Sequence, residues 1–189
     1  MPNNVFYYLR HTETRFDEAI PASQWVLSER GQKQAEDLVH MEIFSNIDVI
    51  ITSGEMKAFH TAMPLAKKLN LHIKQYTELN ELHRDDEEYL TGNEYRRYVN
   101  RTLSKIQNPV GKWESGINAL TRFSKKIDEI NSNYSDENIL VVSHGLVINL
   151  YFCQLLENFD EVFRRWSLTT FCDYGVVKNA KVIEDIVIE

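Results

Sequence analysis

The stretch VFYYLRHTET, residues Val5–Thr14, carries the first signal of the fold. Its opening residues, Val5–Leu9, are apolar and rich in residues that favour β-strands, and the run stops at the charged string Arg10–Glu13. This pattern predicts a buried strand that delivers polar side chains at its carboxyl end. Arg10 and His11 are therefore the first candidate functional residues.

A second predicted strand ends in the same way. The apolar run Asn138–Val142 is followed at once by Ser143, His144 and Gly145. Ligands of open α/β sheets bind outside the carboxyl ends of the strands, so we expect His11 and His144 to share one site. Taken singly, each histidine could equally be a structural residue; the repeated context favours a functional pair.

Helical and strand periods alternate along the rest of the chain. The spacing of apolar residues predicts helices over 28–43, 58–69, 117–130 and 146–156, and strands over 48–51 and 71–75. The tail over 168–188 predicts two final strands with a turn near Asn179. This alternation predicts a three-layer α/β fold, with helices on both faces of a mostly parallel sheet of about five or six strands.

One region interrupts the alternation. Residues 78–113 lack a clean period, apart from a helix expected around Asn93–Ser104, and they contain the acidic run Asp85–Glu88. We expect a long excursion that covers the site. Its aromatic residues are candidates for a lid but fit ordinary packing equally well: Tyr89, Tyr95, Tyr98 and Trp113.

Length and composition limit the class of protein. The 189 residues fit one domain spanning 1–189, and 43% hydrophobic with 26% charged residues is typical of a globular chain. A net charge of −7 argues against general nucleic-acid or acidic-membrane binding, so an anionic substrate requires a local basic pocket. Without a membrane-span-length apolar stretch or a signal peptide, we expect a cytoplasmic protein. Cys153 and Cys172 form no CxxC, which favours reduced thiols.

Five ordered motifs between Leu9 and Gly145 resemble those of the histidine phosphatase superfamily, the phosphoglycerate mutase-like proteins. LRHTET at 9–14 is similar to LRHGET, and LSERGQKQA at 27–35 is similar to LTxxGxxQA. Residues 53–62 resemble SPLxRAxxTA, with Ser53, Ala58, Thr61 and Ala62 in register. LNE at 79–81 resembles the LxE of the proton donor, and VVSHG at 141–145 is the family's VVSHG.

The resemblance implies a metal-independent phosphomonoester hydrolase that needs no cofactor and acts on a small phosphorylated substrate. His11 would attack phosphorus and become a phosphohistidine, and Arg10 would bind two phosphoryl oxygens. His144 would add a further hydrogen-bond donor to those oxygens. Glu81 would protonate the leaving oxygen and then deprotonate the attacking water.

Three positions depart from the family pattern. Lys57 stands where the family has a second phosphate-binding arginine, and a lysine offers a point charge in place of a bidentate fork. Thr12 replaces a glycine beside His11, and Asp17 replaces an asparagine common in the mutase branch. These changes keep two alternatives open, a phosphoglycerate mutase and a degenerate protein that binds phosphorylated ligands with little turnover. The sequence leaves substrate identity and oligomeric state undecided.

Overall fold

The computed structural model describes residues 2–85 and 90–187, and within them six strands form one sheet in the order β3-β2-β4-β1-β5-β6. The strands from β3 to β1 pair in parallel, whereas β5 pairs antiparallel with β1 and with β6. Their bounds are β1 Val5–Arg10, β2 Val49–Ser53, β3 Ile73–Tyr76, β4 Asn138–Ser143, β5 Tyr174–Lys178 and β6 Lys181–Glu184. The mostly parallel sheet predicted from the sequence is confirmed.

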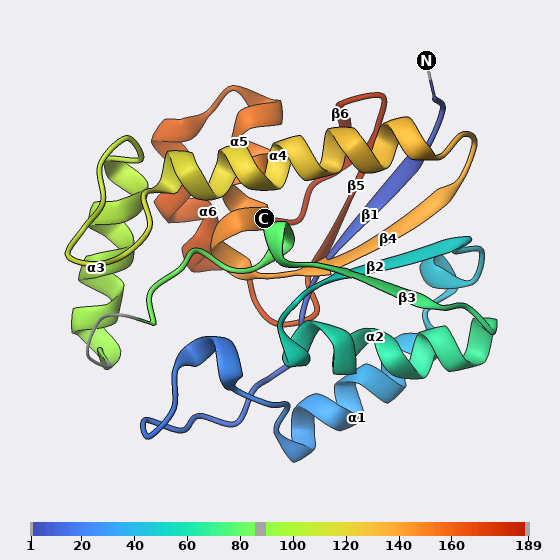
Figure 1. Cartoon of the computed structure of the whole chain (residues 1–189), viewed down its shortest axis with the longest axis horizontal. Helices are drawn as coiled ribbons and strands as arrows, with labels where there is room; N and C mark the ends of the chain where they lie inside the picture. The colour runs from blue at the N-terminus through green and yellow to red at the C-terminus, as the bar shows by residue number, and fades with distance from the viewer. Residues whose placement is uncertain (1, 86–89, 188–189) are drawn as a thin grey trace.

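Helices cover both faces of this sheet (Figure 1). One face carries α1, Glu29–Asp37, and α2, Met56–Leu69. The other carries α3, Gly92–Ser104; α4, Gly116–Asn133; α5, Gly145–Leu156; and α6, Val162–Leu168, with α3 packed against α6. No helix among the described residues combines the length and apolarity needed to cross a membrane.

The core consists of two clusters, one on each face, because side chains alternate along each strand. Tyr8 of β1 and Val141 of β4 pack beneath α4 and α5. The next residues on the same strands, Leu9 and Val142, pack beneath α2 and the two 3-10 turns that follow α1. The central strands are thus buried on both sides, which explains their continuous apolar runs.

The helix predicted over 28–43 differs from the observed structure. Ser28 caps its start, accepting the Gly31 N–H at 2.9 Å, but α1 ends at Asp37 and two short 3-10 turns follow. Leu38 and Phe44 would face different sides of a continuous α-helix, and the extended backbone at Met41 lets both enter the core. The short helix α6 has no counterpart among the sequence-based predictions.

Glycine at position 31 fixes how α1 meets the loop after β1. A Cβ there would lie 1.9 Å from the carbonyl oxygen of Glu13, so only glycine permits this contact. Ser28 also donates its N–H to the same carbonyl. The motif around Gly31 therefore positions the loop that carries His11.

Candidate active site

The two predicted site histidines lie side by side at the carboxyl edge of the sheet. His11 follows β1, His144 follows β4, and their ring centroids are 5.1 Å apart. Ser53 at the end of the neighbouring strand β2 contacts His144. The expectation that parallel strands bring these residues together is confirmed.

His11 is arranged as a neutral imidazole with one free nitrogen. Only 7% of the residue is exposed, and its Nδ1 lies 2.8 Å from the carbonyl oxygen of Thr12. Because a carbonyl can only accept, Nδ1 carries the hydrogen and Nε2 keeps its lone pair. Burial holds the pKa of His11 well below its usual value, and the electrostatic coupling to His144 and the positive charges of Lys57 and Arg10 lower it further.

Arg10 is held by Thr169 and Phe171. Its Nη1 donates to the carbonyl oxygen of Thr169 at 2.6 Å, and its Cζ lies 4.8 Å from the ring centroid of Phe171. Phe171 also lies against the His11 ring, with 5.6 Å between the centroids. A Cβ at Gly145 would be 3.1 Å from the Arg10 Cζ, so the glycine after His144 leaves room for the guanidinium.

His144 is fully buried and lies just behind the surface of the site. Its Nε2 is 2.7 Å from Ser53 Oγ and 3.4 Å from Glu55 Oε1, whereas Nδ1 has no hydrogen-bond partner among the described residues. Burial lowers the pKa of His144 well below its usual value, and the charge of Lys57 lowers it further. The ring is therefore neutral near pH 7.

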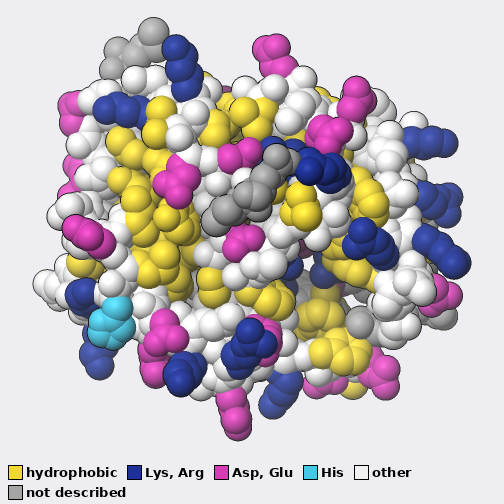
Figure 2. Space-filling model, turned by 180° about the vertical axis from the view of Figure 1, so that it is seen from behind, with side chains coloured by type: hydrophobic (Ala, Val, Ile, Leu, Met, Phe, Trp, Pro, Cys, Tyr) yellow, Lys and Arg dark blue, Asp and Glu magenta, His cyan; other side chains and the backbone are white. Residues whose placement is uncertain are grey.

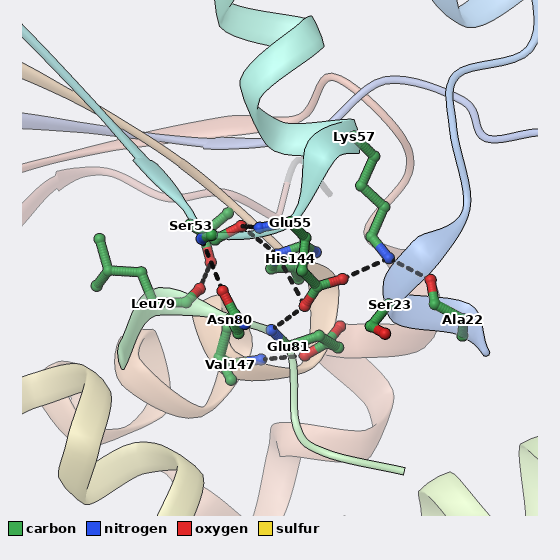
Figure 3. A network of polar contacts seen from close by, with 12 residues as sticks. Ala22, Ser23, Ser53, Glu55, Lys57, Leu79, Asn80, Glu81, His144 and Val147 are labelled. Atoms are coloured by element: carbon green, nitrogen blue, oxygen red, sulfur yellow. Dashed lines mark hydrogen bonds and ion pairs between the residues drawn. The ribbon is translucent and has the colours of Figure 1, made fainter. Parts of the chain in front are cut away.

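Lys57 is held in a buried ion pair (Figure 3). Only 4% of the residue is exposed, which excludes the alternative that it is a solvated helix lysine. Its Nζ lies 2.6 Å from Glu55 Oε2 and donates to the carbonyl oxygen of Ala22 at 2.6 Å. Since an ammonium group has three hydrogens, one remains for another acceptor.

Glu81 binds the start of α5. Its Oε1 accepts N–H groups from Leu82 and Val147, and its Oε2 accepts the N–H of Leu146 at 3.0 Å. Two of these donors belong to the first turn of α5, where unsatisfied N–H groups favour a negative charge. Among the described residues, Oε2 accepts a hydrogen bond from Leu146 alone, which leaves it a lone pair that a proton can use.

The loop that carries Glu81 is fastened by Arg122 of α4, which the sequence analysis did not single out. Its guanidinium donates to the carbonyl oxygens of Glu78, Asn80 and Glu81, each at 2.8 Å. It also binds both carboxylate oxygens of Glu114, at 2.8 and 3.0 Å. A single side chain thus fixes three backbone carbonyls within residues 78–81, the segment that ends in the candidate proton donor.

The side chains at the other two departures from the family pattern, Thr12 and Asp17, point away from the cavity above His11. Thr12 is buried against α2, where its N–H donates to Thr61 Oγ1 at 3.0 Å. Asp17 accepts the N–H of Ala19 and caps its own turn. Neither Thr12 nor Asp17 belongs to the described lining of the cavity above His11.

A cavity of about 570 Å³ opens above these groups, with Arg10, His11, Lys57 and Glu81 in its lining. The 78–113 excursion contributes to it through Tyr95, Trp113 and Arg84, the last of which the sequence analysis missed. Figure 2 shows a hollow in which basic side chains are bordered by hydrophobic ones. Asp85 lines the cavity, whereas residues 86–88 of the acidic run and Tyr89 fall outside the described residues.

Within residues 2–85 and 90–187, no group of three or more histidine, cysteine, aspartate or glutamate side chains is placed to hold a metal ion. Both cysteines are free thiols, and burial raises the pKa of each to about 11.

The profile of the histidine phosphatase superfamily, branch 1, matches residues 6–180. The chain belongs to this superfamily. A curated relative, phosphoserine phosphatase 1 of Hydrogenobacter thermophilus, is 27% identical over 141 residues, which cover 69% of this histidine phosphatase chain and 64% of the relative. The chain thus spans less than two thirds of that relative's length.

Solved structures of the same superfamily share the fold. A mycobacterial glucosyl-3-phosphoglycerate phosphatase superposes with a TM-score of 0.79 at 17% identity, covering 97% of this chain and 99% of the other. YhfR of Bacillus stearothermophilus gives a TM-score of 0.79 at 19% identity, with 98% of each chain covered. At this identity the likeness shows the fold alone.

Proposed function

We propose that this chain hydrolyses phosphomonoesters through a phosphohistidine formed on Nε2 of His11, without a metal ion. The hydrogen bond from Nδ1 to the Thr12 carbonyl supports the proposal most directly, because it leaves a lone pair on Nε2. The lowered pKa of His11 keeps that nitrogen unprotonated at neutral pH. A neutral, fixed imidazole is what nucleophilic attack on phosphorus requires.

The reaction takes place in two displacements. Nε2 of His11 forms the N–P bond while the P–O bond to the alcohol breaks, and Glu81 gives its proton to the leaving oxygen. Glu81 then accepts a proton from water, whose oxygen attacks phosphorus as the N–P bond breaks. The free lone pair on Oε2 is the position at which Glu81 holds this proton.

Charge on the transferred phosphoryl group is balanced by side chains. Arg10 offers its remaining N–H groups, and Lys57 offers its third hydrogen. His144 offers an N–H at Nδ1, the nitrogen without a partner in the described structure, while Ser53 occupies Nε2. Because Glu55 neutralises Lys57, Arg10 carries most of the electrostatic stabilisation.

The decisive experiment compares the wild type with His11→Ala in hydrolysis of p-nitrophenyl phosphate in excess EDTA. The proposal predicts turnover by the wild type alone, together with a base-stable, acid-labile phosphoprotein in rapidly quenched wild-type samples. Activity that disappears on chelation contradicts the metal-free mechanism. Activity that survives in His11→Ala contradicts the assignment of the nucleophile.

Two further assays separate this function from the alternatives. Incubation with either isomer of phosphoglycerate yields inorganic phosphate if the chain is a hydrolase, and yields the other isomer if it is a mutase. Calorimetry with inorganic phosphate detects a binding protein. Phosphate binding without turnover of any ester overturns the hydrolase proposal.

A further inference from the structure

The cavity above His11 is larger than a phosphoryl group needs. Its volume of about 570 Å³ falls within the range of pockets that enclose whole drug-sized molecules. Arg10, His11, Lys57 and Glu81 account for only part of its lining. In-line attack by Nε2 of His11 puts the leaving oxygen on the opposite side of phosphorus, so the leaving alcohol has to occupy the rest of the cavity.

One part of this space is walled by three packed aromatic rings. Tyr95 of α3 lies 5.8 Å from Trp113 and 6.1 Å from Trp166 of α6, centroid to centroid. Trp113 is only 3% exposed and belongs to the core. This wall is therefore formed before any ligand binds.

The loop after β1 supplies a second group of aromatic rings. Phe16 packs edge-on against Trp25 with centroids 5.3 Å apart, and Trp25 Nε1 donates to the Asp17 carbonyl at 2.8 Å. Both line the cavity, yet 50% of Phe16 is exposed. An apolar ligand that covers such an exposed ring removes its surface from water, which stabilises the complex.

Charges in the lining balance one another. Among the described lining residues, three are cationic and three are anionic: Arg10, Lys57 and Arg84 against Glu18, Glu81 and Asp85. Glu55 neutralises Lys57, and Glu81 carries a proton when the ester binds, so Arg10 and Arg84 face Glu18 and Asp85. No surplus of positive charge therefore remains for a second anionic group on the substrate. The Cζ of Arg84 lies 5.2 Å from the Tyr95 centroid and 5.8 Å from that of Trp113, which extends the flat wall with a guanidinium plane.

We propose that the substrate is the phosphomonoester of an uncharged alcohol that carries a flat aromatic ring. This inference rests on the hydrolysis proposed at His11. A ring placed above the phosphoryl site gains offset and edge contacts with Tyr95, Trp113 and Trp166 in addition to the burial of its apolar surface. A small zwitterionic alcohol such as serine gains neither.

The test compares three esters whose leaving oxygens are all aliphatic: 2-phenylethyl phosphate, 2-cyclohexylethyl phosphate and phosphoserine. We expect kcat/KM for the phenyl ester to exceed that of each other ester by about tenfold, the size of one or two aromatic contacts. Equal values for the phenyl and cyclohexyl esters overturn the requirement for a flat ring. Phosphoserine as the best substrate overturns the inference as a whole.

Variants locate the preference in the aromatic walls. Phe16→Ala and Trp166→Leu should each reduce the preference for the phenyl over the cyclohexyl ester at least threefold, roughly one aromatic contact. The matched control is Phe59→Ala, a partly buried aromatic residue of α2 outside the cavity lining, which should leave the preference unchanged. Because Phe16 is half exposed, Phe16→Ala should fold, and it tests the aromatic preference even if Trp166→Leu does not fold.

The outcomes separate this inference from the proposed function. If all three esters are hydrolysed at the same rate and His11→Ala abolishes this activity, the proposed reaction stands and the proposed aromatic substrate class is wrong. If no ester is hydrolysed, the proposed function fails. Calorimetry then still tests the aromatic preference through binding of 2-phenylethylphosphonate and 2-cyclohexylethylphosphonate. Equal affinities for these two compounds contradict the aromatic pocket.

Discussion

Lys57 and Glu55 form an ion pair of 2.6 Å in which each side chain is only 5% exposed. The other oxygen of Glu55 accepts the N–H of Glu81 at 2.8 Å and lies 3.4 Å from Nε2 of His144 (Figure 3). One buried carboxylate thus links the lysine, a site histidine and the candidate proton donor. Its charge requires the lysine, because an unpaired carboxylate at this depth is costly.

Removing the lysine alone should destabilise the protein. Lys57→Met leaves Glu55 charged and unpaired, which we expect to lower the free energy of unfolding by about 3–5 kcal/mol. The double variant Glu55→Gln/Lys57→Met, which removes both charges, should recover most of this loss. Urea denaturation measures both. Equal losses in the single and double variants would show that the ion pair does not matter for stability.

Arg122 is expected to act on the reaction by positioning Glu81. Arg122→Lys keeps the charge but cannot bind three backbone carbonyls and Glu114 together. We expect kcat for alkyl phosphates, which need the proton donor, to fall about tenfold, with a smaller change for p-nitrophenyl phosphate. Equal reductions for both substrates would indicate a general loss of folding instead.

Glu81 itself should control reactions with poor leaving groups. Glu81→Gln keeps one carbonyl oxygen, which can still accept the N–H of Val147, but the NH2 group that replaces Oε2 cannot accept the N–H of Leu146. The start of α5 therefore stays partly capped while the acid is lost. General acid catalysis is commonly worth about 100-fold or more, so alkyl phosphates should lose that factor and p-nitrophenyl phosphate much less. A uniform loss across leaving groups would remove Glu81 from this role.

Stability should rise with pH through the titration of the two buried histidines. Their pKa values are held well below about 6.5, the value in the unfolded chain, so below that pH the unfolded state binds more protons. The free energy of unfolding should therefore fall as the pH drops from about 6.5 to the folded-state pKa values, by up to about 1.4 kcal/mol per pH unit for each histidine.

Urea denaturation between about pH 5 and about pH 8 measures this dependence. His11→Gln and His144→Gln should each reduce the slope, whereas His72→Gln, at an exposed position, should keep it. A stability that stays flat below about pH 6.5 would mean that the two histidines are protonated in the folded protein.

Much of the framework followed from local patterns. Hydrophobic periods predicted the central strands and most of the helices, and the position of His11 and His144 after β1 and β4 predicted that they meet. The helix predicted over 28–43 failed at Asp37, because packing of Leu38 and Phe44 against α2 overrode the apparent period. The sequence showed that Lys57 replaces the arginine of the family pattern, but it did not predict that Lys57 is buried in an ion pair with Glu55.

The sequence by itself determined which functional side chains stand at the carboxyl ends of the parallel strands. Strand period and β-α alternation are local properties, so they can be recognised without the tertiary structure. Only the tertiary structure decided the partners of those side chains. Glu55 and Lys57 are near neighbours in sequence, yet the contacts of Glu55 with Glu81 and His144 join residues 26 and 89 positions apart. Arg122 reaches its carbonyls across more than 40 positions. Such contacts depend on how helices and loops pack in space, which no local pattern encodes.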